Sequence, residues 1–168
     1  MGGEPKSSTS GAPRASRPNL PGYGIAAADE GEGLLPWSWA RERLTAARNY
    51  FLSTTSPGGR PHVMVIWGLW QDDRFIFSTA QASRKGRNLA ADPRCVVCPE
   101  AAEEAVIVEG VASRLDDAAA LARAATAYQA KYGWDIHGPK EPILVVTPRL
   151  IFGQIEKTFT KSATRWQF

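Results

Sequence analysis

Residues 62–94 read HVMVIWGLWQDDRFIFSTAQASRKGRNLAADPR, and the fold is best inferred from this stretch. Two runs rich in β-branched and aromatic residues flank the polar Gln71-Asp72-Asp73, which predicts two neighbouring strands. The segment that follows predicts a short helix with Ser83 as its N-cap. Asp92-Pro93 predicts the end of that helix, because proline disfavours a helical conformation in the residue before it.

The first turn of this helix carries three cations, Arg84, Lys85 and Arg87. A helix N-terminus already presents unpaired N–H donors and partial positive charge, so each added cation costs up to about 1 kcal/mol. An anion bound among these cations would offset that cost, and phosphate commonly binds at such a place. The turn therefore predicts a phosphate site, with the Ser83 hydroxyl and the Asn88 amide close by. The alternative is that Lys85 and Arg87 are ordinary solvated side chains.

The strand at 62–70 is apolar on both faces. Its side chains fall into two sets: Val63, Val65, Trp67 and Leu69 on one face, and Met64 and Ile66 on the other. This pattern predicts a central barrel strand that is covered on both sides. Further strands are expected at 48–56, 94–98, 105–115, 143–146 and 150–156, with helices at 37–47 and 118–132 and a last short segment at 163–168. Together they predict a closed, mainly antiparallel β-barrel with flanking helices outside it.

The chain of 168 residues is expected to form one domain at 34–168, preceded by a disordered tail at 1–33. The tail holds 7 of the 15 glycines and 4 of the 12 prolines, so it has little apolar surface to bury. It contains three basic and four acidic residues, which leaves a net charge of +4 on the domain.

Charge and hydropathy exclude several classes of protein. The net charge is +3 and the cations gather at one small site, which suits a small anion better than nucleic acid. No apolar run has the length of a membrane-spanning helix and no secretory signal is present, so a cytoplasmic location is expected. Cys95 and Cys98 lie three apart on a predicted strand and point to opposite faces, so we expect neither a metal site nor a disulfide.

The sequence contains no convincing nucleophile–base pair. Its two histidines are His62 and His137, and no G-x-S-x-G motif is present. An anion site with aromatic neighbours and no catalytic constellation indicates that a bound cofactor carries the chemistry. No catalytic residue is therefore predicted.

Several motifs, in this order, resemble the flavin split-barrel proteins, which are pyridoxamine 5'-phosphate oxidase-like flavin and deazaflavin oxidoreductases. They are Pro61-His62-Val63, Phe77-Ser78-Thr79, Ser83-Arg84-Lys85-Gly86-Arg87-Asn88-Leu89 and Asp92-Pro93-Arg94. The ending Ala163-Thr164-Arg165-Trp166-Gln167-Phe168 is similar to that of the deazaflavin-using branch. The likeness runs from about residue 37 to the C-terminus. It implies an FMN-binding split barrel that forms a homodimer, with each cofactor at the subunit interface.

The resemblance also implies which residues meet the cofactor. The tricyclic ring would lie along the strand that contains Pro61, His62, Val63, Met64, Val65 and Trp67, whose backbone would bind the pyrimidine edge of the ring. Thr79 and Ser83 would meet the ribityl-phosphate region, and Lys85 and Arg87 would neutralise the phosphate beside Asn88. Trp166 of the partner subunit would pack against the ring or the substrate. Arg165 would pair with an anionic group beside that ring or substrate.

The branch of the family decides the reaction. Vitamin oxidases carry an Arg-x-His pattern near the C-terminus, and this chain has no histidine there. The ending and the positive domain favour coenzyme F420, a deazaflavin with an acidic tail, although Gly86 also looks like the FMN-using branch. The resemblance therefore implies an F420-dependent reductase that passes a hydride to a small electron-poor substrate. The alternatives are an FMN-dependent oxidase and a non-catalytic flavin-, deazaflavin- or haem-binding protein.

Overall fold

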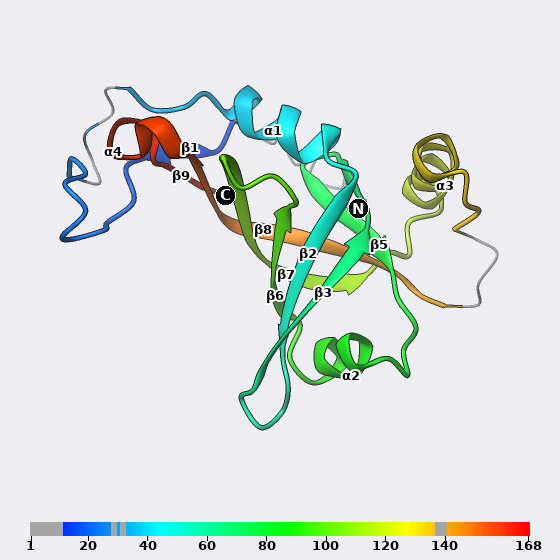
Figure 1. The fold of residues 1–168 in the computed structure, drawn as a ribbon. Coiled ribbons are helices and arrows are strands. Elements are labelled where there is room, and N and C mark those ends of the chain that lie inside the picture. Colours follow the sequence, from blue (N-terminus) through cyan, green and yellow to red (C-terminus); the bar gives the residue numbers. More distant parts are fainter. Residues whose placement is uncertain (1–11, 28–29, 31–32, 137–140) are drawn as a thin grey trace, which may run out of the picture.

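The computed structural model describes residues 12–27, 30, 33–136 and 141–168 (Figure 1). The strands are β1 Arg14–Ser16, β2 Asn49–Thr55, β3 Pro61–Trp67, β4 Leu69–Gln71, β5 Arg74–Ser78, β6 Arg94–Pro99, β7 Glu104–Arg114, β8 Ile143–Ile155 and β9 Thr164–Gln167. The helices are α1 Trp37–Ala46, α2 Arg84–Ala91, α3 Ala118–Tyr132, the 3-10 helix η1 Glu156–Thr158, and α4 Phe159–Ser162.

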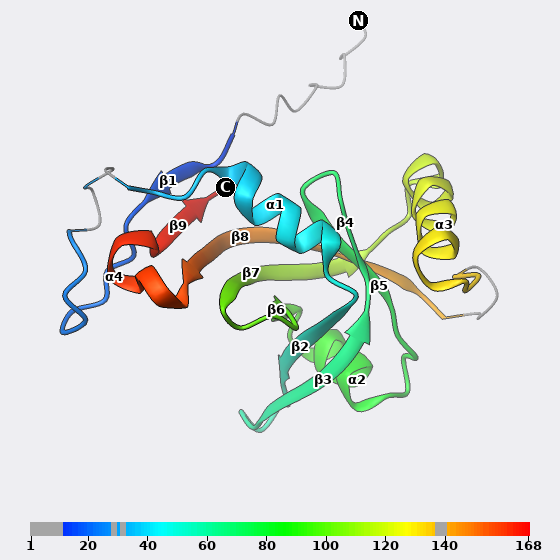
Figure 2. The ribbon, with the colours of Figure 1, turned by 45° about the horizontal axis from the view of Figure 1, so that its top comes forward.

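The nine strands form one curled, open sheet with the order β1-β9-β8-β7-β6-β2-β3, and β5 pairs with both β4 and β8. Every pair between described strands is antiparallel. The helices lie around the outside of this sheet, with α2 and α3 at separate places (Figure 2). The predicted fold class, an antiparallel split barrel with flanking helices, is confirmed, although the sheet is open and not closed.

The two helices that flank the candidate site begin and end at local signals. The Ser83 hydroxyl accepts a hydrogen bond from the Gly86 N–H at 3.1 Å and so caps α2. Asp117 caps α3 in the same way, and Gly133 ends α3 with a φ of 67°. No helix in the described part of the chain is long and apolar enough to cross a membrane.

The longest pairing of the sheet joins β7 to β8, and here the structure differs from the prediction of two strands at 143–146 and 150–156. The chain continues as one strand through Pro148, which lies opposite Gly110 at a shift in the register. A proline lacks an N–H, so it is tolerated where the ladder is already irregular. Gly110 is required there, because a Cβ would lie 2.6 Å from the Thr147 carbonyl oxygen.

The core has two parts. The larger cluster lies within the curled sheet and includes Tyr50, Phe75, Phe77 and Trp166. The second cluster lies between α3 and the sheet and includes Ile76, Leu115, Ala124, Tyr128 and Ile143. The site described below lies beside this second cluster, because Tyr128 belongs to both.

The prediction that the strand at 62–70 is central is wrong. β3 is at the end of the sheet order and pairs with β2 alone among the described strands. Val63 and Val65 are each 55% exposed, Met64 is 45% exposed and Trp67 is 40% exposed. An apolar pattern on both faces indicates that both are normally covered, but it does not distinguish cover by the same chain from cover by another molecule.

The N-terminal segment also differs from the predicted tail. Residues 1–11, 28–29 and 31–32 lie outside the described residues. Arg14–Ser16, however, pairs with β9, and Arg17 is only 4% exposed. Its Nη1 donates to the carbonyl oxygens of Lys161 at 2.7 Å and Ala163 at 3.0 Å. Composition missed this order because the contacts that produce it come from residues about 145 positions away.

Replacing Arg17 with alanine is expected to lower the free energy of unfolding by about 2–3 kcal/mol, because charged hydrogen bonds are lost and buried carbonyls remain unpaired. Urea denaturation measures the change. The matched control is Arg14→Ala, since Arg14 is exposed and joins β9 through its backbone. Equal stability of the two variants would contradict the prediction.

Candidate functional site

A hollow of about 320 Å³ lies beside β3. Four separate elements, β3, β5, α2 and α3, supply its lining: Val65, Ile66, Trp67, Ser78, Lys85 and Tyr128. The structure therefore brings Lys85 of the predicted phosphate site together with Val65 and Trp67 of the predicted ring platform.

The three cations of α2 do not converge on this hollow. Lys85 is half-buried and lines it, whereas Arg84 and Arg87 are exposed and do not. The Arg87 guanidinium donates to the carbonyl oxygen of Ala82, in the loop before the helix. Lys85 is thus the best-placed of the three to meet an anion in the hollow.

The start of α2 packs closely against the preceding loop. A Cβ on Gly86 would lie 2.4 Å from the Ala80 carbonyl oxygen and 2.7 Å from that of Gln81, so only glycine fits. The Ser83 hydroxyl is also 3.2 Å from the hydroxyl of Thr79, which is only 6% exposed. The hydroxyls of Thr79 and Ser83, both predicted to contact the ribityl-phosphate region of a cofactor, therefore lie next to each other at the start of α2.

Asn88 has a different role from the predicted one. It is 3% exposed, and its Nδ2 donates to the hydroxyl oxygen of Thr54 on β2 at 3.0 Å. The same oxygen is 3.5 Å from Nδ1 of His62. The predicted contact between Asn88 and a phosphate is corrected, because this amide is buried and holds α2 on the sheet.

The C-terminal residues lie elsewhere. Figures 1 and 2 show β9 well separated from α2. Arg165 donates from Nε to the hydroxyl of Ser16 at 3.1 Å. Trp166 has no exposed surface and packs edge-on against Trp37, with ring centroids 5.6 Å apart. The prediction that Trp166 walls a ligand in another subunit is therefore corrected, since the side chain has no surface to offer.

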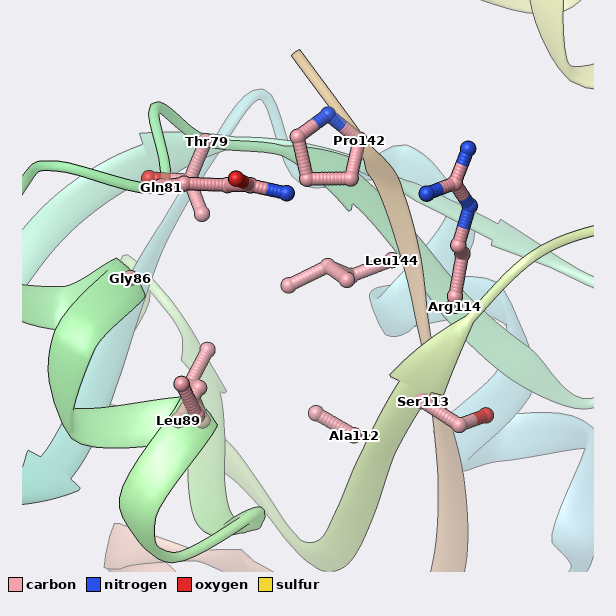
Figure 3. A pocket seen from close by; sticks show the side chains of 10 residues that line it. Thr79, Gln81, Gly86, Leu89, Ala112, Ser113, Arg114, Pro142 and Leu144 are labelled. Carbon is pink, nitrogen blue, oxygen red and sulfur yellow. The ribbon is translucent and has the colours of Figure 1, made fainter.

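A second pocket of about 390 Å³ lies between α2 and the ends of β7 and β8 (Figure 3). Its walls include Leu89, Ala112 and Leu144, and Figure 3 shows Leu144 pointing into the space. Arg114 is also part of the lining, but its Nε pairs with Asp116 at 2.8 Å. This pocket was not predicted from the sequence, because it joins segments that are distant along the chain.

A third pocket of about 480 Å³ adjoins the hollow beside β3, with which it shares Trp67, Ser78 and Tyr128. Two further lining residues, Thr79 and Ala80, follow the end of β5. The others are Trp134 and Ile136, which precede residues 137–140, and Glu141, which follows them. His137 lies outside the described residues. This pocket was not predicted from the sequence either.

Lys131, in the last turn of α3, ties this helix to the sheet. Its Nζ donates to the Tyr50 hydroxyl at 3.1 Å and to the Gly68 carbonyl oxygen at 3.2 Å. Next to it, Tyr132 stacks on Trp67 with ring centroids 4.8 Å apart and an interplanar angle of 9°. The Tyr132 hydroxyl donates to the Arg48 carbonyl oxygen at 2.6 Å. This cluster therefore fixes the ring of Trp67 at the junction of the hollow and the third pocket.

The pKa of Lys131 is lowered from its ordinary 10.5 to about 8, chiefly by burial and also by nearby Arg48, while Glu100 opposes the shift. Between these two values the unfolded chain holds a proton that the folded chain lacks, so Lys131 makes stability rise with pH. Its stabilising contribution is complete above the unfolded pKa and is lost as the pH falls through about 8. Burial raises the pKa of Tyr50 and of Tyr128, which acts in the opposite direction above about pH 10.

Lys131→Met should therefore flatten the pH dependence of stability on the alkaline side of neutrality. Urea unfolding of the native chain and the variant, compared between about pH 8 and pH 10, measures the difference. We expect the native chain to gain stability relative to the variant as the pH rises through this range. Parallel profiles would show that Lys131 titrates normally in the folded chain.

Neither cysteine is placed for metal or redox chemistry. Both are free, and burial raises the pKa of the Cys95 thiol to about 12. Within the described residues, no three histidine, cysteine, aspartate or glutamate side chains gather in a way that could hold a metal ion.

The sequence model of a family described as pyridoxamine 5'-phosphate oxidase matches residues 39–155. The chain belongs to this family. A pyridoxine/pyridoxamine 5'-phosphate oxidase from Anaeromyxobacter dehalogenans is 43% identical over 72 residues, which is 41% of this chain and 36% of that relative. The aligned region thus covers well under half of the curated relative.

Solved structures share the fold at low sequence identity. An F420 reductase matches with a TM-score of 0.56 and 21% identity, over 70% of this chain and 98% of that chain. A haem-binding protein from Mycobacterium smegmatis matches with a TM-score of 0.58 and 18% identity, over 76% of this chain and 62% of that chain. Because these identities are low, the likenesses concern the fold alone.

Proposed function

We propose that this protein is a reductase that transfers a hydride between reduced coenzyme F420 and a small electron-poor substrate, with FMN as the alternative cofactor. The observation that carries the proposal is that Lys85 and the apolar residues Val65 and Trp67 line one hollow. A cation next to an apolar strand suits a ligand that has a phosphate at one end and a flat ring at the other.

The residues of β3 fit such a ring. One edge of β3 pairs with β2, and no described strand pairs with the other edge. Backbone N–H and C=O groups on a free edge can hydrogen-bond the polar edge of a ring, as they would a neighbouring strand. In this proposal Pro61, His62, Val63 and Met64 extend the platform, and Thr79, Ser83, Lys85 and Arg87 lie toward the phosphate.

A reduced deazaflavin or flavin supplies the hydride when it is bound. The protein supplies the remaining requirements, which are binding, orientation and exclusion of water. Lys85 would hold the anionic end, and the stacked pair of Trp67 and Tyr132 would keep the apolar end rigid. Rigid placement matters because a hydride passes only between closely aligned atoms.

Replacing Lys85 with alanine should weaken cofactor binding by about tenfold or more, since charge-assisted contacts to phosphate contribute roughly 1.5–3 kcal/mol. Arg87→Ala should weaken it less, because Arg87 does not line the hollow. Lys157→Ala, on the exposed η1, is the matched control. Calorimetric titration with F420 and with FMN measures each dissociation constant. An unchanged value for Lys85→Ala would place the anion site elsewhere.

The same titrations separate the alternatives. Micromolar binding of FMN without binding of F420 would make FMN the cofactor, and oxygen consumption by the yellow protein would then indicate an oxidase. A binding protein without catalysis is expected to hold the cofactor but to leave quinones, enones and nitroaromatics unreduced. The haem-binding protein that shares the fold is the reason to add haem to the titration.

We also propose that two copies of the chain pair through the outer face of β3. Large apolar side chains gather on one face of β3 and on the adjoining β2: Phe51, Val63, Val65 and Trp67. Single exposed apolar residues are common, but a contiguous group on an edge strand marks an interaction site. A second copy would cover the group and close the hollow from outside.

Val63→Asp should therefore convert a dimer into monomers, because a two-fold interface would bring the new carboxylates into an apolar contact. Analytical ultracentrifugation at micromolar concentration measures the state. Tyr23→Asp is the control, since Tyr23 is 63% exposed in a different part of the structure. A native chain that sediments as a monomer would overturn the proposed pairing.

A further inference from the structure

His62 belongs to a chain of three side chains that joins α2, β2 and β3. The Asn88 amide on α2 donates from Nδ2 to the Thr54 hydroxyl oxygen at 3.0 Å. That oxygen lies 3.5 Å from Nδ1 of His62, which is directly opposite Thr54 in the register of β2 and β3. The contact that holds α2 on the sheet therefore continues to an imidazole ring on β3.

The first member of this chain sets the direction of its hydrogen bonds. An amide nitrogen can only donate, so the Thr54 oxygen accepts from Asn88, and the Thr54 proton needs an acceptor of its own. Thr54 is 3% exposed, and the described part of the chain offers its proton no acceptor other than Nδ1 of His62. A buried hydroxyl proton without an acceptor is costly, so Nδ1 accepts from Thr54.

This direction decides which nitrogen of the ring carries the proton. A neutral imidazole has one nitrogen that accepts and one that donates. With Nδ1 as the acceptor, the proton of neutral His62 is on Nε2. Nδ1 faces Thr54 on β2, and the two ring nitrogens point in divergent directions, so Nε2 is directed away from β2. On that side β3 has no described strand as its neighbour.

The Nε2–H group is available to a ligand. Nε2 has no hydrogen-bond partner within the described residues and is not among the buried unpartnered atoms found there, so it reaches solvent. It lies on the same strand as Val65 and Trp67, which line the hollow together with Lys85. The fold therefore places an oriented donor at the edge of β3 along which the cofactor ring is proposed to lie.

We infer that neutral His62 carries its proton on Nε2 and donates it in a hydrogen bond to a carbonyl oxygen of the cofactor ring, with Thr54 and Asn88 as positioning residues. FMN and F420 both have carbonyl oxygens at the pyrimidine end of the ring, so the inference applies to either. Its second half rests on the proposed function, whereas the placement of the proton does not.

The position of the proton is measured without a cofactor. Long-range proton–nitrogen NMR spectra of the full chain, isotope-labelled in its histidine nitrogens, distinguish a protonated ring nitrogen from a bare one. His62→Gln identifies the signal, because His137 is the only other histidine. In mildly alkaline buffer we expect a single form, with Nε2 protonated and Nδ1 bare. Thr54→Val should give a mixture of both forms, and Thr54→Ser, which keeps the hydroxyl, should restore the single form.

Two substitutions at position 62 locate the donor. Glutamine extends its amide to about the place of Nε2, whereas asparagine places it near Nδ1. In calorimetric titrations with F420 and with FMN, we expect His62→Gln to keep a dissociation constant within about twofold of the native value. His62→Asn should raise it about three- to tenfold, because one net hydrogen bond is lost. Lys157→Ala, on the exposed η1, is again the control.

A native His62 that is protonated on Nδ1, or that exchanges freely between both forms, would overturn the inference, and this measurement remains if Thr54→Val does not fold. Equal cofactor binding by His62→Gln and His62→Asn would also overturn it, even if His62→Asn reduced 1,4-naphthoquinone more slowly, because the donor would then meet the substrate. Cofactor binding that does not depend on residue 62 removes this inference alone. A chain that binds neither F420 nor FMN removes the proposed function and, with it, the assignment of the donor to the ring.

Discussion

The hydrogen bond between the Asn88 amide and the Thr54 hydroxyl fixes α2 on the sheet, and the candidate site depends on that placement. Both residues are 3% exposed, so neither polar group has water as a substitute partner. With α2 held there, Lys85 lies beside β3 rather than in open solvent. The charge of the hollow is thus positioned by a buried neutral contact, which keeps its geometry independent of salt.

Elements with local signals could be predicted from the sequence, and elements that depend on distant contacts could not. Ser83 and Asp117 are helix caps, so the starts of α2 and α3 were predicted correctly. The place of β3 in the sheet depends on which strands pair with it, and its apolar pattern does not contain that information. Two strands were predicted at 143–146 and 150–156, but β8 continues through Pro148, which lies opposite Gly110.

The same distinction applies to the site. Lys85 and β3 were expected to share a ligand, and the structure brings them to one hollow. Asn88 and Trp166 were assigned to the ligand because they lie in the motifs that resemble the family, but their side chains are buried within their own chain. Trp134 was missed because its neighbour Trp67 is 67 residues away, and only the folded chain brings them to one pocket.

The pairing of β1 with β9 has a consequence for how the protein behaves in crowded solution. Without residues 14–16, the backbone of β9 would present an unsatisfied row of donors and acceptors along the end of the sheet. Such a row is a template for strand addition by other unfolded or damaged chains. The short N-terminal strand covers the backbone of β9 and leaves an edge of only three residues at this end of the sheet, which offers less backbone for strand addition.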